Sequence, residues 1–202
     1  MRRAYFIVIE GLDGAGKTTI SKWLVEVFEK NGRSAIYTYE PNDTKFVDAL
    51  KSYKEYRTPE LDALAYAADR LVHLRKVVIP ALLSGTDVIM DRYYFSSIAY
   101  QGASGVPIEW VIEVNRYAIK PDLSIYIDVE PETGLTRIKK GKSSSRFPEY
   151  EKIDLLRKVR EIYIDMVNRG WLEYVDGNHP IEQVKGEVLS VINQKLRLGL
   201  RA

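Results

Sequence analysis

Eight residues near the N-terminus, Gly11–Thr18, fit the phosphate-loop pattern G-x-x-x-x-G-K-[ST]. Glycines allow successive backbone N–H groups to turn inward around a polyphosphate, and a following helix adds its positive end. Lys17 supplies a mobile cation for the β- and γ-phosphates, and the Thr18 hydroxyl is placed to reach Mg²⁺. These residue types at this spacing predict a site for a nucleoside triphosphate.

The segments on either side of this loop have the patterns that such a site requires. The apolar run Ala4–Ile9 predicts a buried strand. Behind the loop, large apolar residues recur at helical spacing until Asn31-Gly32 ends the helix; they are Ile20, Trp23, Leu24, Val27 and Phe28. The order of strand, glycine loop and helix favours nucleotide binding over a glycine-rich turn that merely opens a helix.

Strands and helices alternate along the rest of the chain. We expect strands at Ala35–Tyr39, Asp87–Asp91, Leu123–Asp128 and Trp171–Val175. We expect helices around Phe46–Leu50, from Thr58-Pro59 to Ser84-Gly85 with a kink at Pro80, over Ile108–Ala118, from Pro131 to Ile138, over Ile153–Val167 and over Ile181–Ile192. Such alternation predicts an α/β fold of three layers, in which five parallel strands carry helices on both faces.

Polar residues suited to chemistry fall at one edge of the predicted sheet. Ligands of parallel sheets bind at the carboxyl ends of the strands, and the residues at or just past those ends are Asp13, Glu40, Asp91 and Asp128. Asp91 either holds Mg²⁺, directly or through water, or caps the next helix. Arg92 follows at once, and its guanidinium either binds phosphate oxygens bidentately or forms a surface ion pair.

Two further segments carry side chains suited to a nucleotide. Tyr66 and Arg70 lie four residues apart on a helix, near His73, and therefore share a face that could stack on a nucleobase and hydrogen-bond it. A packed tyrosine beside an exposed arginine is the alternative. The segment Arg137–Arg146 holds five cations and no acid. It predicts a mobile basic flap that closes over a triphosphate, unless it is a solvated loop.

Composition and charge narrow the class of protein. The chain has 202 residues, which favours one domain with a sizeable core. Its net charge of +2 gives little support for a nucleic-acid or membrane partner. The absence of cysteine excludes disulfides and thiolate metal sites. There is no apolar run of membrane-spanning length, and the first strand leaves no room for a signal peptide, so we expect a cytoplasmic protein.

Several motifs together resemble the thymidylate kinase family. They are Ile9–Thr19, Tyr66–Arg70, Asp91–Tyr93 with Ser96–Gly102, Lys120-Pro121-Asp122 and Asp176-Gly177, and the similarity spans nearly the whole chain. The resemblance implies the P-loop nucleoside monophosphate kinase fold, as one domain over residues 1–202 with a mobile lid at about residues 139–150. It also implies Mg²⁺-dependent transfer of the γ-phosphoryl group of ATP to dTMP, which gives dTDP for dTTP synthesis, and a homodimer.

The same resemblance implies roles for the matching residues. ATP would bind on Gly11, Leu12, Asp13, Gly14, Ala15, Gly16, Lys17, Thr18 and Thr19, with the metal at Thr18 and Asp91. The dTMP site would consist of Asp13, Glu40, Tyr66, Arg70, Arg92, Ser97, Tyr100 and Gln101. Within it, Tyr66 would stack on thymine while Arg70 hydrogen-bonds the base, and Ser97 and Gln101 would read the pyrimidine edge. Asp13 would contact the 3′-hydroxyl, Tyr100 would lie against the sugar, and Arg92 would hold the acceptor phosphate.

The implied catalytic residues are Lys17, Arg92 and Asp13, together with a further arginine. Family members carry this arginine either in the phosphate loop or in the lid. The variable loop positions Leu12–Ala15 hold no basic residue, which implies the lid type, with Arg146 as first choice and Arg137 as second. The chain departs from the family pattern at three places. Tyr39 stands where many members have arginine, Asn42-Asp43-Thr44 replaces Gly-Gly-Thr, and Ser145 replaces the aspartate that commonly precedes the lid arginine.

Two other functions are compatible with a phosphate loop. A deoxynucleoside kinase must remove a proton from a 5′-hydroxyl, and Glu40 could serve as its base. A monophosphate acceptor is largely dianionic at neutral pH, so it needs cations and no base. Arg70, Arg92 and Arg146 therefore favour a nucleotide as acceptor. A nucleotide-dependent switch is the second alternative, and it would leave the acceptor residues without a role.

Overall fold

The structure is a computed structural model that describes residues 3–42, 44–141 and 152–202. Five parallel strands form one sheet in the order β2-β3-β1-β4-β5. The strands are β1 (Phe6–Gly11), β2 (Ala35–Tyr39), β3 (Asp87–Asp91), β4 (Leu123–Asp128) and β5 (Glu173–Asp176). The sequence prediction of a three-layer α/β fold around five parallel strands is confirmed.

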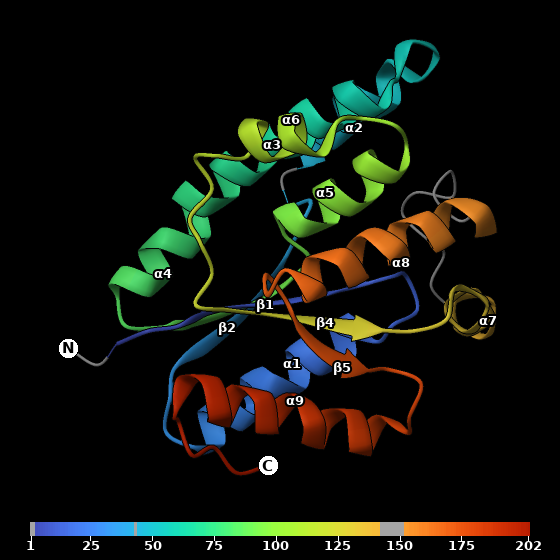
Figure 1. Cartoon of the computed structure of the whole chain (residues 1–202). Coiled ribbons are helices and arrows are strands. Elements are labelled where there is room, and N and C mark those ends of the chain that lie inside the picture. The colour runs from blue at the N-terminus through green and yellow to red at the C-terminus, as the bar shows by residue number, and fades with distance from the viewer. Residues whose placement is uncertain (1–2, 43, 142–151) are drawn as a thin grey trace.

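Helices cover both faces of the sheet (Figure 1). Below it in this view lie α1 (Lys17–Lys30) and α9 (Ile181–Leu196). Above it lie α3 (Pro59–His73), α4 (Ile79–Leu83), α5 (Tyr94–Ala103), α6 (Ile108–Val114) and α8 (Ile153–Asn168), with α2 (Thr44–Ser52) against α3. Helix α7 (Pro131–Lys140) stands beyond the carboxyl end of β4 and packs against α8. None of the helices in the described ranges is long and apolar enough to cross a bilayer.

The central strand β1 explains why its sequence is apolar without alternation. Ile7 and Ile9 belong to the larger buried cluster, together with Leu24 of α1. Phe6 and Val8 point the other way and belong to a second buried cluster. Both faces of the strand are therefore covered, as expected for the middle of a parallel sheet.

Most element bounds agree with the sequence predictions, and the exceptions have local causes. The bounds of β2, β3 and β4 are confirmed, while β1 and β5 begin two residues later than predicted. Helix α6 ends at Val114 instead of Ala118, because the side chain of Asn115 donates to the Val111 carbonyl and ends the helix. Only Arg92 and Tyr93 separate β3 from α5.

The long helix predicted from Pro59 to Ser84 is divided into α3, a π-helical turn at Leu74–Val78, and α4. Pro80 is the second residue of α4 and has no N–H for the carbonyl of Lys76. The chain ahead of it adopts the wider π turn, so the irregularity lies one turn before the predicted kink.

The basic segment that was expected to be irregular from residue 139 begins as helix. Helix α7 continues through Lys139 and ends at Lys140, with Arg137 also in its last turn. Cations in this position interact favourably with the negative end of the helix dipole. Residues 142–151, and Arg146 among them, lie outside the described residues.

Helix α3 presents its polar face to the interior. Asp62, Asp69, Arg70 and His73 are buried, whereas Leu64 is 49% exposed. A buried face made of charged residues is stable only when hydrogen bonds and ion pairs satisfy it, and this face lies against a cavity and the ends of the strands. Its residues include Arg70, which the sequence analysis placed in the acceptor site.

Candidate active site

One cavity of about 550 Å³ opens at the carboxyl ends of β1, β2 and β3. Its walls come from the phosphate loop, the end of β2, helix α3, the β3–α5 segment and α7; they include Asp13, Gly14, Gly16, Lys17, Thr18, Tyr39, Glu40, Tyr66, Arg70, Asp91, Arg92, Ser97, Tyr100, Gln101 and Arg137. A volume of this size accommodates nucleotide-sized ligands. The structure thus brings the phosphate loop and every described residue of the expected acceptor site to a single cavity.

The phosphate loop is held in shape by its glycines and by the Lys17 side chain. Gly14 and Gly16 have φ angles of 81° and 89°, which strain other residues, and Gly16 opens α1. The Nζ of Lys17 donates to the carbonyl of Leu12 at 2.8 Å and is buried. Burial lowers the pKa of Lys17, as does the charge of Arg92, while nearby carboxylates oppose this change.

Not all of the residues assigned to the ATP site line the cavity. Its lining does not include Gly11, Leu12, Ala15 and Thr19. The side chains of Leu12 and Ala15 are packed in the core, so only their backbone groups can contribute to phosphate binding. Gly14 packs directly against Gly134 of α7, which leaves no room for a Cβ atom on either residue.

Asp91 and Thr18 form a pair suited to a divalent cation. The Thr18 hydroxyl donates to Oδ2 of Asp91 at 2.5 Å. The other carboxylate oxygen, Oδ1, is buried and has no hydrogen-bond partner among the described residues. Oxygen donors of this kind fit Mg²⁺, which keeps several waters and takes its remaining ligands from phosphates. No cluster of three or more potential metal-binding side chains occurs in the described ranges.

Arg92 lies at the meeting point of the phosphate loop and α5. Its φ angle of 69° is in the left-handed region, which is uncommon for a residue with a side chain. Nη2 donates to Oδ1 of Asp13 at 2.7 Å, Nη1 donates to Oγ of Ser96 at 3.0 Å, and the guanidinium lies over the Tyr100 ring. Burial would raise the pKa of Asp13, but the charges of Arg92 and Lys17 lower it below its usual value.

Arg70 is fixed by a buried polar cluster. Its Nε donates to Oε2 of Glu40 at 2.7 Å, Nη2 donates to Oγ of Ser97 at 3.2 Å, and Nη1 donates to Oδ1 of Asn115. The Nδ1 of His73 lies 3.3 Å from Oε1 of Glu40, so both carboxylate oxygens face a partner. The guanidinium is therefore held as a rigid planar group on the wall of the cavity, one helical turn from Tyr66.

The side chain of Arg137 is held by hydrogen bonds, unlike that of a mobile lid residue. Its Nη2 donates to the carbonyl of Gly177 at 3.0 Å and its Nη1 to the carbonyl of Gly14 at 3.5 Å. It thereby joins α7 to the phosphate loop and to the segment after β5. Asp128 also differs from its neighbours at the sheet edge: it pairs with Arg160 of α8 and is not part of the cavity wall.

Several residues of the site were given no role by the sequence analysis, although Glu10 and Ser96 lie within its motifs. Asn115, Ser96 and Gly134 act through contacts with residues far away in the chain, which no local pattern shows. Glu10 had a visible signal, since it is an acid inside an otherwise apolar strand. It is fully buried and accepts hydrogen bonds from Tyr93, Ser96 and Tyr163.

Fold and site together define a class of protein. A P-loop nucleotide kinase is characterised by a phosphate loop after the first strand of a parallel sheet, a carboxylate suited to magnesium at the end of a neighbouring strand, and arginines for a second phosphorylated ligand. Here these features are the loop after β1, Asp91 at the end of β3, and Arg70 and Arg92 on the wall of the same cavity.

Comparison with known proteins identifies the family within this class. The chain matches the sequence model described as Thymidylate kinase over residues 9–188. It is 51% identical to the probable thymidylate kinase of Staphylothermus marinus and 43% identical to that of Archaeoglobus fulgidus, in each case over 95% of this chain and 96% of the relative. It is 37% identical to the probable thymidylate kinase of Pyrococcus abyssi, over 98% of this chain and 100% of the relative. The chain belongs to the thymidylate kinase family.

Proposed function

We propose that the cavity described above carries out the family's reaction with the following division of roles. The protein is an enzyme that transfers the γ-phosphoryl group of ATP to dTMP and yields ADP and dTDP, a step of dTTP synthesis. The ATP phosphates lie on the loop Gly11–Thr19, and dTMP lies between α3 and α5. The single observation that carries this proposal is the shared cavity, whose wall contains Lys17 together with Tyr66, Arg70 and Arg92.

On the donor side, backbone N–H groups of the loop and the start of α1 bind the phosphates. Lys17 binds the β- and γ-phosphates, and its Nζ then donates to phosphate oxygens in place of the Leu12 carbonyl. Thr18 and Asp91 would hold Mg²⁺. When bound, this cation supplies neutralisation of the charge on the phosphates.

On the acceptor side, Arg70 and Tyr66 bind the thymine, and Ser97 and Gln101 face its edge. Asp13 and Tyr100 border the sugar. Arg92 holds the acceptor phosphate, since its guanidinium lies between Asp13 of the phosphate loop and Tyr100 of α5. An oxygen of that dianionic phosphate attacks the γ-phosphorus while the bond to the bridging oxygen of ADP breaks, and no proton needs to be transferred.

The position of Glu40 supports a nucleotide acceptor over a nucleoside. A kinase of a 5′-hydroxyl needs a carboxylate free to accept a proton. Both oxygens of Glu40 instead face Arg70 and His73, where the carboxylate orients Arg70. The presence of an acceptor pocket beside the phosphate loop likewise supports a transferase over a nucleotide switch.

We propose that the chain is one domain with a lid at about residues 139–150. An arginine of the lid stabilises the negative charge on the γ-phosphoryl group during its transfer. Arg146 remains our first choice and lies outside the described residues. Arg137 is the second choice, and its hydrogen bonds to Gly14 and Gly177 support a structural role for it.

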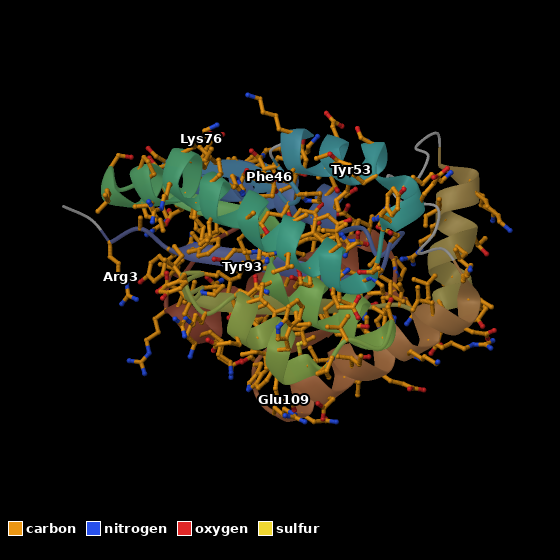
Figure 2. The ribbon with its side chains drawn as sticks, turned by 90° about the horizontal axis from the view of Figure 1, so that it is seen from above. Arg3, Phe46, Tyr53, Lys76, Tyr93 and Glu109 are labelled. Atoms are coloured by element: carbon orange, nitrogen blue, oxygen red, sulfur yellow. The ribbon has the colours of Figure 1, made fainter. Side chains whose placement is uncertain are left out.

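We also propose a homodimer. Apolar side chains are exposed on three adjacent helices: Phe46 on α2 (labelled in Figure 2), Leu64 on α3 and Ile112 on α6. A second copy of the chain, which presents the same surface, is the occupant that a twofold contact requires. Analytical ultracentrifugation should give a dimer for the protein and a monomer for Leu64→Glu; a monomeric unaltered protein contradicts this. We further propose that the small-molecule partners are ATP, dTMP and Mg²⁺ and that the protein acts in the cytoplasm.

A panel of phosphate acceptors tests the proposed function. ATP and Mg²⁺ are supplied with dTMP, dUMP, dCMP, dAMP or thymidine, and the phosphorylated product is quantified. The proposal predicts the highest kcat/KM for dTMP and no turnover of thymidine. Turnover of thymidine with none of dTMP would show a nucleoside kinase, and ATP hydrolysis unaffected by every acceptor would show a switch.

A further inference from the structure

The buried carboxylate of Glu10 has partners in three parts of the fold. It lies on β1 immediately before the phosphate loop, and it is fully buried. Oε1 accepts from the backbone N–H groups of Tyr93 at 2.7 Å and Ser96 at 3.3 Å. Oε2 accepts from the hydroxyls of Ser96 at 2.7 Å and Tyr163 of α8 at 2.8 Å.

These contacts place Glu10 at the start of α5. Tyr93 is the N-terminal cap residue of this helix, and its side chain makes no capping hydrogen bond. The carboxylate of Glu10 accepts from the N–H of Tyr93 and shares the N–H of Ser96 with the Tyr93 carbonyl, and its negative charge lies at the positive end of the helix. A residue on a different element, 83 positions earlier in the chain, thus caps α5.

Through the same contacts Glu10 acts on Arg92. The Ser96 hydroxyl donates to Glu10 and accepts from Nη1 of Arg92 at 3.0 Å. Arg92 itself has the strained φ angle of 69°, and the backbone is held at Arg92 and at the next residue: the N–H of Arg92 donates to the carbonyl of Ile9, and the N–H of Tyr93 donates to Glu10. A strained backbone persists only when its surroundings fix it.

We infer that Glu10 is a positioning residue for the acceptor nucleotide. It acts through Ser96 on the guanidinium of Arg92, and through the first turn of α5 on Ser97, Tyr100 and Gln101. Because Glu10 directly precedes Gly11, it also sets the distance between the acceptor pocket and the phosphate loop. Tyr93, whose N–H it binds, is fully buried and lies near the middle of the molecule in Figure 2. This inference rests on the proposed function, since it concerns the dTMP half of that site.

The test compares Glu10→Gln with a matched control, Asp87→Asn. Asp87 is also a buried carboxylate with several hydrogen bonds, to Arg33 and to the N–H of Tyr5, but it lies at the opposite end of the sheet. Both variants lose a buried charge and should melt at a lower temperature. We expect Glu10→Gln to lower kcat/KM for dTMP about ten- to hundredfold, while KM for ATP changes less than about twofold. Asp87→Asn should leave both within about twofold.

A second variant keeps the inference testable if Glu10→Gln does not fold. Ser96→Ala removes the link between Arg92 and Glu10 but leaves the carboxylate at the start of α5, and it should shift the same constant in the same direction. In the double variant the two losses should be less than additive, because both break one path. Equal loss for ATP and dTMP, full additivity, or a loss in Glu10→Gln no larger than in Asp87→Asn would overturn the inference. Failure of the unaltered enzyme to phosphorylate dTMP would instead refute the proposed function.

Discussion

Gly134 offers a sharp test of how the phosphate loop is supported. It lies inside α7, at the end of the first turn, where glycine is less favourable than alanine, and its backbone packs against the backbone of Asp13 and Gly14. A Cβ atom at this position would lie 2.6 Å from the carbonyl oxygen of Asp13. Ordinary contact begins near 3.4 Å, so Gly134→Ala must separate helix and loop by about 0.8 Å.

The size of the effect follows from this displacement. Inserting a methyl group into a tight backbone contact costs about 1–3 kcal/mol, and replacing glycine by alanine in a helix returns about 0.5–1 kcal/mol. The net loss of roughly 0.5–2 kcal/mol lowers Tm by about 1–8 °C in a chain of this size. A shift approaching 1 Å in the loop that we propose binds the transferring phosphate should lower kcat/KM for ATP about ten- to hundredfold.

Gly186 provides the matched control. It also lies inside a helix, α9, but a Cβ atom there meets nothing within 4 Å. Gly186→Ala should therefore raise Tm by about 1–4 °C and leave the kinetic constants unchanged. Differential scanning calorimetry and initial-rate kinetics on both variants distinguish the two sites. If Gly134→Ala also raised Tm and bound ATP normally, the close packing of α7 on the phosphate loop would be refuted.

The other predictions concern the charges of the site. Lys17→Ala should lower kcat at least about hundredfold, because it removes a cation from the phosphate site. The far-UV CD spectrum should be unchanged, because the Lys17 side chain is not part of the hydrophobic core, and a loss of helical signal would contradict this. Arg146→Ala should lower kcat about 10³-fold or more with little change in KM for dTMP, and a small effect there with a large one for Arg137→Ala would reverse our choice. Burial opposes ionisation of Asp13, but the charges of Arg92 and Lys17 lower its pKa in the folded protein. The ionised carboxylate therefore stabilises the fold at any pH above the ordinary carboxyl pKa of about 4, and this stabilisation is lost as the pH falls through the pKa of the folded state. Asp13→Asn should therefore flatten the decline of Tm between pH 6 and 2, and an unchanged decline would refute this.

Features that depend on neighbouring residues in the chain could be predicted from the sequence. The phosphate loop, the strand before it and the helix after it follow from glycine spacing and apolar periodicity. The carboxyl ends of parallel strands share one edge, so topology places Asp13, Glu40, Asp91 and Asp128 at that edge. The first three line the cavity, whereas Asp128 pairs with Arg160, which topology does not reveal.

Features that depend on contacts between distant segments could not be predicted. The apolar positions of α3 suggest a packing face, yet Leu64 is half exposed, and the charged face is buried because Arg70, Glu40 and His73 satisfy one another. No sequence pattern reveals that Glu10 caps α5 or that Asn115 holds Arg70, since both partners lie on other elements. The burial of the charged face of α3 is therefore explained only by the tertiary structure.

The central claim is that donor and acceptor phosphates meet in one cavity. A compound in which adenosine and thymidine are joined through a polyphosphate chain tests it most directly, by equilibrium titration of its binding. The account predicts one molecule bound per chain, displaced by ATP and by dTMP alike, with binding weakened in both Lys17→Ala and Arg70→Ala. Displacement by ATP alone, with full affinity retained in Arg70→Ala, would contradict it.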